Sequence, residues 1–228
     1  MDVILKAANV MDRLARSIGK LAGWLMIPLI FVIIFDVVTR KIDATRLYFS
    51  DFSIEYGYSI STILQDLQWH FHGALMMLVF GFGYLANAHV RVDIFREMLP
   101  RRRQAWLEFF GLLILAVPFL VLMIVYSWNL VSLSYSQGEG SESLTGIPQR
   151  WIIKSFVIIG FIFAMFSVLA TMGRLWVYLK GSAEQQDQAL SGLAIFTDVQ
   201  TELEKAREAA ERALREEEEA RDRAGNGG

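Results

Sequence analysis

The chain has 228 residues and no cysteine, which excludes a disulfide framework, a thiolate metal site and a cysteine nucleophile. The net charge of −2 is unevenly distributed, because residues 184–228 carry twelve of the 24 acidic residues but only six of the 22 basic ones. The rest of the chain is basic and contains four separate apolar runs of about 20 residues, a pattern typical of an integral membrane protein.

Residues 1–20 form a mostly polar, basic segment before the first predicted transmembrane span at residues 21–38. We expect this span to be a retained anchor and not a signal peptide, because no small-residue cleavage site follows it. Pro28 removes one helical hydrogen bond and is expected to kink the span. Asp36 lies near the end of the span and Arg40 one turn later, so a salt bridge is predicted in preference to an ion-binding site.

The stretch from Thr45 to Asp66 mixes aromatic and aliphatic residues with serines and acids. This composition favours an amphipathic helix lying in the membrane interface between the first two spans. The alternative is that this stretch forms a loop packed on the outer face of the membrane bundle.

The second predicted span covers residues 67–88 and begins with several polar side chains. His70 and His72 are two residues apart, so on a helix they point in nearly opposite directions and cannot hold one metal ion. His89 lies at the far end of the same span, and the other spans supply no histidine to face it. We therefore expect neither haem nor a metal site.

Small residues on the second span, Gly73 and Gly81, lie along one line of the helix and leave room for another backbone. This pattern favours close packing with a helix of this chain or of a partner. The chain contains no phosphate-binding loop, no nucleophile–base pair and no paired carboxylates within the spans, so an enzyme is not predicted.

The third and fourth spans are predicted at residues 107–132 and 151–179, and Pro118 is expected to kink the third. The loop between them is rich in glycine, serine and glutamate, which is typical of a solvated turn that could meet a soluble partner. Residues 21–180 thus form a four-helix membrane domain. Residues 181–228 form a charged tail, predicted to be helical from its pairs of opposite charges four residues apart.

Lysines and arginines predict the orientation of these spans. Eleven of them flank one side of the predicted bundle and four the other, so both termini are expected to face the cytoplasm.

Three short strings carry a resemblance to a known family: LQWH at residues 67–70, HVRVD at 89–93 and GIPQRW at 146–151. Their order and placement resemble the small permease subunit of tripartite ATP-independent periplasmic (TRAP) transporters, the DctQ-like subunit, over about residues 20–180. Two features depart from the family pattern. The fourth span lacks a proline before Gly160, and the charged tail has no evident counterpart.

The resemblance implies a small subunit that pairs with a much larger, DctM-like membrane subunit and works with a periplasmic, DctP-like solute-binding protein. The larger subunit would carry the substrate and sodium sites, and the small one would be a stationary scaffold in the bacterial inner membrane. We therefore expect a non-enzymatic, cofactor-free subunit of a sodium-coupled transporter for an organic acid, with no nucleic-acid partner. Two alternatives stay open: a membrane anchor of a redox enzyme that uses these histidines, and a self-contained small transporter.

Two sets of contact residues are predicted. The first, expected to face the larger subunit, lies at the two ends and along one line of the second span: Gln68, Trp69, His70, Gly73, Gly81, His89, Arg91 and Asp93. The second, expected to receive the binding protein, lies in the loop before the fourth span: Glu139, Glu142, Pro148 and Arg150.

Overall fold

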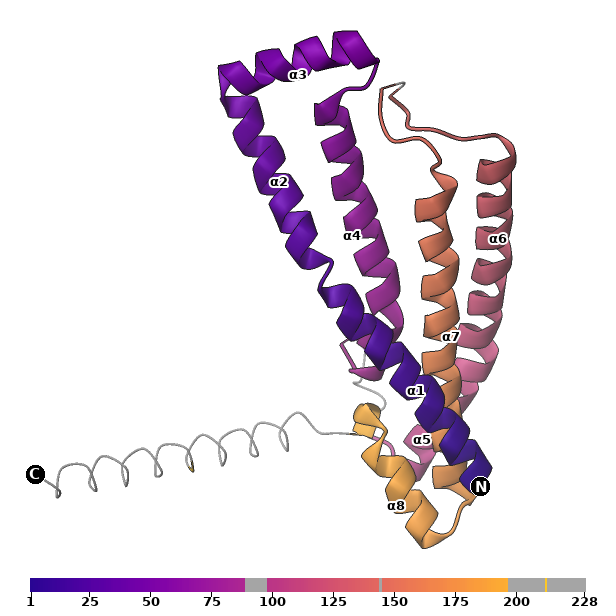
Figure 1. Ribbon diagram of the computed structural model, residues 1–228. Helices are drawn as coiled ribbons and strands as arrows, with labels where there is room; N and C mark the ends of the chain where they lie inside the picture. Colours follow the sequence, from indigo (N-terminus) through magenta and orange to yellow (C-terminus); the bar gives the residue numbers. More distant parts are fainter. Residues whose placement is uncertain (89–97, 144, 197–211, 213–228) are drawn as a thin grey trace, which may run out of the picture. The chain divides into compact units, whose positions relative to one another are not determined.

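The structure, a computed structural model, describes residues 1–88, 98–143, 145–196 and 212 (Figure 1). The regular elements of these described residues are all helical. The chain divides into two compact units, residues 1–192 and 193–228. Among the described residues, every long helix belongs to the first unit. Of the second, the structure describes Leu193, a short 3-10 helix, Ala194–Phe196, and Arg212.

The first predicted span is part of a longer pair of helices, α1 (Asp2–Gly23) and α2 (Met26–Lys41). The break between them follows from Pro28, which has no N–H to donate to the Trp24 carbonyl. That carbonyl accepts a hydrogen bond from Ile27 instead, at 3.2 Å. Helix α1 thus includes almost all of the polar segment 1–20 together with the start of the apolar run. It contacts both α4 and α7.

Residues 45–66 do not form one element. Helix α3 (Asp43–Tyr56) ends at Gly57, whose φ of +74° is a left-handed conformation that glycine adopts without strain. Helix α4 (Ile60–Leu85) then begins seven residues before the predicted span, capped by the Ser59 hydroxyl, which accepts from the Thr62 amide. No residue of α3 is buried within the chain. Its position at the membrane interface stays a prediction.

The third span is one continuous rod of three segments: α5 (Arg101–Gly111), a π-helical turn (Leu112–Ala116) and α6 (Val117–Ser136). The π-helical turn ends two residues before Pro118, where the chain must accommodate a missing amide hydrogen. Helix α7 (Trp151–Lys180) matches the predicted fourth span within one residue. Helix α8 (Ala183–Ser191) follows, and beyond residue 196 the predicted helical tail lies outside the described residues, Arg212 apart.

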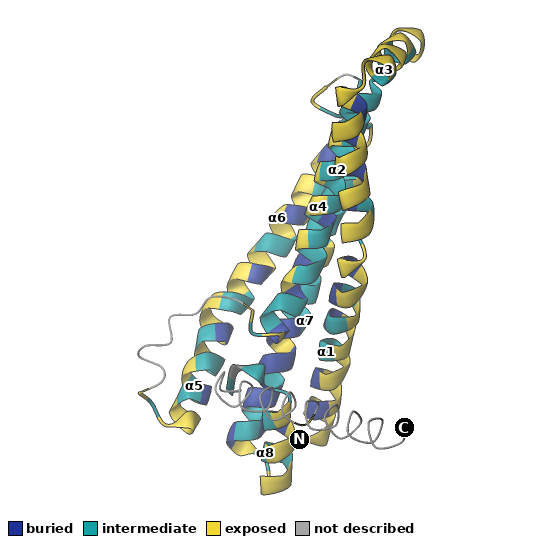
Figure 2. Cartoon of the chain, turned by 90° about the vertical axis from the view of Figure 1, so that its left-hand side faces the viewer, coloured by how far each residue is buried: buried dark blue, intermediate teal, exposed yellow. Residues whose placement is uncertain are grey.

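Helix α7 holds the first unit together, since α1, α4, α5, α6 and α8 all contact it. It also has the longest series of buried residues (Figure 2). Glycines allow α4 and α7 to approach closely. A Cβ atom on Gly160 would lie 2.5 Å from the Met77 carbonyl oxygen, and one on Gly81 would lie 2.7 Å from that of Phe163.

Three helical stretches of the described chain are long and apolar enough to cross a membrane: Asp2–Lys41, Arg101–Ser136 and Trp151–Lys180. The all-helical membrane class is confirmed, whereas the count of four spans is not. Helix α4 has 26 residues, but polar side chains such as Gln68, His70 and His72 lower the hydropathy of its first half. Much of the apolar surface of α2 and α6 is exposed, as expected for helices that face lipid (Figure 2).

We predict that Gly160→Ala destabilises the protein by about 1–3 kcal/mol, because the added methyl group would overlap the α4 backbone. The measurement is the thermal unfolding midpoint in mild detergent. Gly111→Ala is the matched control, since a Cβ there meets nothing within 4 Å. Equal midpoints for the two variants would contradict the assigned α4–α7 contact.

Candidate functional site

A polar junction joins α2 to α4 near the start of the predicted second span. Asp36 is 4% exposed, and Arg40 donates to it from Nε at 2.9 Å, which confirms the predicted salt bridge. Gln68 donates from Nε2 to the same carboxylate at 3.2 Å. One predicted contact residue, Gln68, is therefore already engaged within the chain and fixes the distance between the two helices.

A second junction joins α4 to the loop between α6 and α7. The Asp66 carboxylate accepts the Ile147 amide at 2.9 Å, and the Ser59 amide donates to the Thr145 carbonyl at 3.1 Å. His70 Nδ1 donates to the Asp66 backbone carbonyl one turn earlier. The loop that contains the GIPQRW string is thus held against the first turns of α4.

The loop itself is fixed at its base and exposed at its tip. Glu139 forms an ion pair with Lys154 of α7, and its backbone carbonyl accepts the Arg150 amide at 2.9 Å. The hydrogen bond from the Lys154 ammonium lowers the pKa of the Glu139 carboxyl below its ordinary value of 4.5. Glu142 is 90% exposed and only loosely paired with Arg150, at 3.4 Å, and Pro148 is also exposed.

An apolar groove runs between α4 and α6. It contains two pockets of about 340 and 240 Å³, each lined by residues of α4, of α7 and of the α5–α6 rod. The face that α4 presents here includes Gly73, where an added Cβ would meet nothing within 4 Å, and the exposed side chains of Met76 and Phe80. Trp69, one turn before Gly73 on the same face, is 75% exposed. We call this surface the α4–α6 groove.

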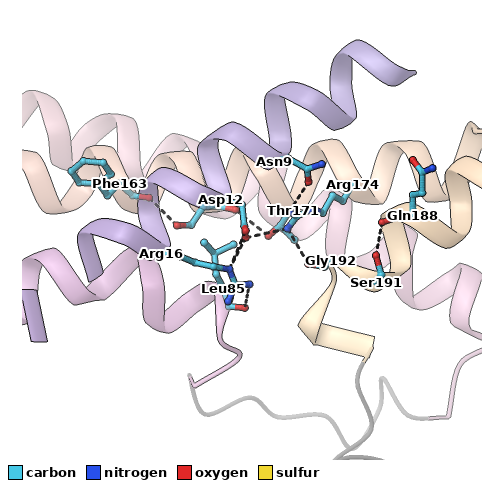
Figure 3. Close-up of polar contacts among 11 residues, drawn as sticks. Asn9, Asp12, Arg16, Leu85, Phe163, Thr171, Arg174, Gln188, Ser191 and Gly192 are labelled. Carbon is cyan, nitrogen blue, oxygen red and sulfur yellow. Dashed lines mark hydrogen bonds and ion pairs between the residues drawn. The ribbon is translucent and has the colours of Figure 1, made fainter. Parts of the chain in front are cut away.

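A third polar junction lies at the opposite end of α4 (Figure 3). Asp12 of α1 accepts from Arg174 of α7 at 3.1 Å and from Arg16 of its own helix at 3.0 Å. Arg174 is 5% exposed and also donates to the Asn9 side chain and the Gly192 carbonyl, both at 2.9 Å. Arg16 donates to the carbonyl of Leu85, the last residue of α4, at 3.3 Å.

The structure brings together some predicted site residues and separates others. Gln68 and His70 take part in the junctions at the start of α4, while Trp69 and Gly73 face the α4–α6 groove. Gly81 contacts the α7 backbone in this same chain. His89, Arg91 and Asp93 lie outside the described residues. A role in binding another subunit stays a prediction for all of them.

The junction around Arg174 was not anticipated from the sequence. A signal for it exists, because an arginine inside an otherwise apolar run must find a partner when it is buried. The sequence did not point to Asp12 as that partner, since 162 residues separate them.

Within the described residues no group of three or more histidine, aspartate or glutamate side chains is placed to hold a metal ion. His70 bonds to its own helix, and His72 is exposed on α4. The arrangement therefore offers polar junctions between helices and an apolar groove.

A family model for the DctQ component of tripartite ATP-independent periplasmic transporters matches residues 29–177. The chain belongs to this family. It is a small membrane subunit of a TRAP transporter. The matched part runs from the first turn of α2 almost to the end of α7, and so includes the first two junctions and the α4–α6 groove. No curated protein and no solved structure matches the chain significantly.

We predict that Glu139→Gln lowers the thermal midpoint of this DctQ-family protein at neutral pH. Because the pKa of Glu139 is lowered in the folded state, its stabilising effect is present above 4.5 and is lost as the pH falls through the lowered value. The difference between wild type and variant should therefore vanish in acid. Glu142→Gln, at an exposed and loosely paired carboxylate, is the control and should show no such pH-dependent difference.

We predict that Asp12→Asn destabilises the protein by about 3 kcal/mol, because it leaves the buried Arg174 guanidinium without a counter-charge. Adding Arg174→Met to the same chain should restore part of this loss. Chemical unfolding in detergent, followed by tryptophan fluorescence, measures both effects. A double variant less stable than Asp12→Asn alone would contradict the pairing.

Proposed function

We propose that this chain is a non-catalytic scaffold of a sodium-coupled TRAP transporter in the bacterial inner membrane. It would hold the large, DctM-like permease subunit in the bilayer while that subunit takes up an organic acid delivered by a DctP-like periplasmic binding protein. The observation that carries this proposal is the DctQ family match over residues 29–177. The bundle supports it by offering polar junctions that join its helices and an apolar groove on its surface.

The α4–α6 groove is the surface proposed for the large subunit. Without a hydrophobic driving force inside the bilayer, helices associate through close packing, and small residues allow their backbones to approach. Gly73 provides such a point with no internal neighbour, and Trp69, Met76 and Phe80 provide the apolar surface around it. Gly81 meets its close neighbour within the chain, so its proposed contribution is to seat α4 on α7.

The loop between α6 and α7 is proposed to meet the binding protein. Glu142 and Pro148 are exposed at its surface, whereas Glu139 and Arg150 attach it to α7. An anchored base with exposed residues suits a docking surface, since a fixed loop loses less conformational entropy on binding than a free one. This proposal places the loop in the periplasm and both termini in the cytoplasm, with α4 as the fourth span.

The test is co-purification with the large subunit, co-expressed from a neighbouring reading frame, followed by solute uptake into liposomes. Gly73→Leu should lower the amount of large subunit recovered by about tenfold, because it fills the groove where the partner would pack. Sodium-dependent uptake with the binding protein should fall in parallel.

Gly111→Leu is the matched control, because its position is equally open but lies on α5 outside the groove. Equal recovery for the two variants would contradict the proposed surface. Uptake by this chain alone would contradict the scaffold and favour a self-contained transporter. A Soret band in the purified protein would favour the redox anchor.

A further inference from the structure

A pocket of about 280 Å³ lies beside the junction of Asp12 and Arg174. Four cationic side chains line it, three from α1 and one from α7: Arg13, Arg16, Lys20 and Arg174. Asp12 is the only carboxylate among the lining residues. The transport role proposed above makes no use of this pocket.

The charges in this pocket do not balance. Asp12 is shared by Arg16 and Arg174, so one negative charge faces two guanidinium groups. Arg13 and Lys20 are exposed and have no side-chain partner among the described residues. The pocket therefore has a surplus of about three positive charges, which an anion of the right shape would compensate.

The pocket lies at the depth of the lipid headgroups if α1 and α2 cross the membrane. Arg13, Arg16 and Lys20 occupy neighbouring positions on one face of α1, and the apolar run of the helix pair begins at Leu21. Guanidinium groups bind phosphate oxygens in pairs, and basic pockets between helices on the cytoplasmic side suit anionic lipid headgroups.

We propose that this pocket binds a phosphate group, contributed by the headgroup of an anionic phospholipid or by free phosphate. Arg13 and Lys20 would provide the free donors. Arg16 and Arg174, held in place by Asp12, Asn9 and the Leu85 carbonyl, would form the fixed side of the site.

The experiment uses the full chain in mild detergent, with its partner where the two co-purify, and counts bound lipids by native mass spectrometry. Phosphatidylglycerol and phosphatidylcholine are the probes, and the expected result is a clear preference for phosphatidylglycerol. The variant Arg13→Gln/Lys20→Gln should bind phosphatidylglycerol at least about tenfold more weakly, because each basic side chain near an anionic surface contributes roughly a factor of five.

The matched control is Lys6→Gln/Arg103→Gln, which removes two cations that do not line this pocket. A second arm compares thermal stabilisation by sodium phosphate and by sodium chloride at equal ionic strength. One outcome would assign the site to free phosphate: the wild-type protein is stabilised selectively by phosphate, the pocket variant is not, and neither prefers phosphatidylglycerol. A wild-type protein with neither preference, or a pocket variant that behaves like the control, would overturn the proposal.

Discussion

The close contact between α4 and α7 is the constraint on which the rest of the bundle depends. Lipid tails are as apolar as the helices, so little hydrophobic force brings membrane helices together, and contact requires small residues. Gly81 and Gly160 provide this from opposite sides, because each faces the other helix's backbone at a distance that leaves no room for a Cβ atom. Once α7 is packed on α4, the other helices are positioned by their contacts with these two. Helix α1 contacts both, α2 contacts α4, and α5, α6 and α8 contact α7.

Polar junctions then fix the two ends of α4. Gln68, in the first half of α4, donates to Asp36 of α2, and the carbonyl of the last residue of α4, Leu85, accepts from Arg16 of α1. Because α1 is joined through Asp12 to Arg174 of α7, four helices are linked to one another by hydrogen bonds. Helix α6 contacts α7 but takes part in none of these junctions, which leaves the α4–α6 groove as the open side of the bundle.

The sequence predicted those features that local pattern determines. Helix α7 and the third span follow from their unbroken apolar runs, and the salt bridge of Asp36 with Arg40 from a separation of one helical turn. The packing of α1 was missed, because its buried stripe is narrow and consists largely of alanine and glycine within a polar sequence. The division at Gly57 was missed because a single left-handed residue ended a helix inside a uniform composition. Arg174 and Asp12 were not paired because nothing local connects residues on different helices.

The distribution of charge along the helices favours a scaffold over a self-contained transporter. No aspartate, glutamate, lysine or arginine occurs between Lys20 and Asp36, between Glu108 and Glu139, or between Lys154 and Arg174. Sodium and an organic acid both need charged or polar ligands in place of the water they leave behind, and transporters commonly provide these near the middle of the membrane. In this chain the charged residues lie outside these three stretches, and several of them join α1, α2, α4 and α7 to one another. Such a distribution stabilises a fixed arrangement of helices, and it supports the proposed role of a scaffold.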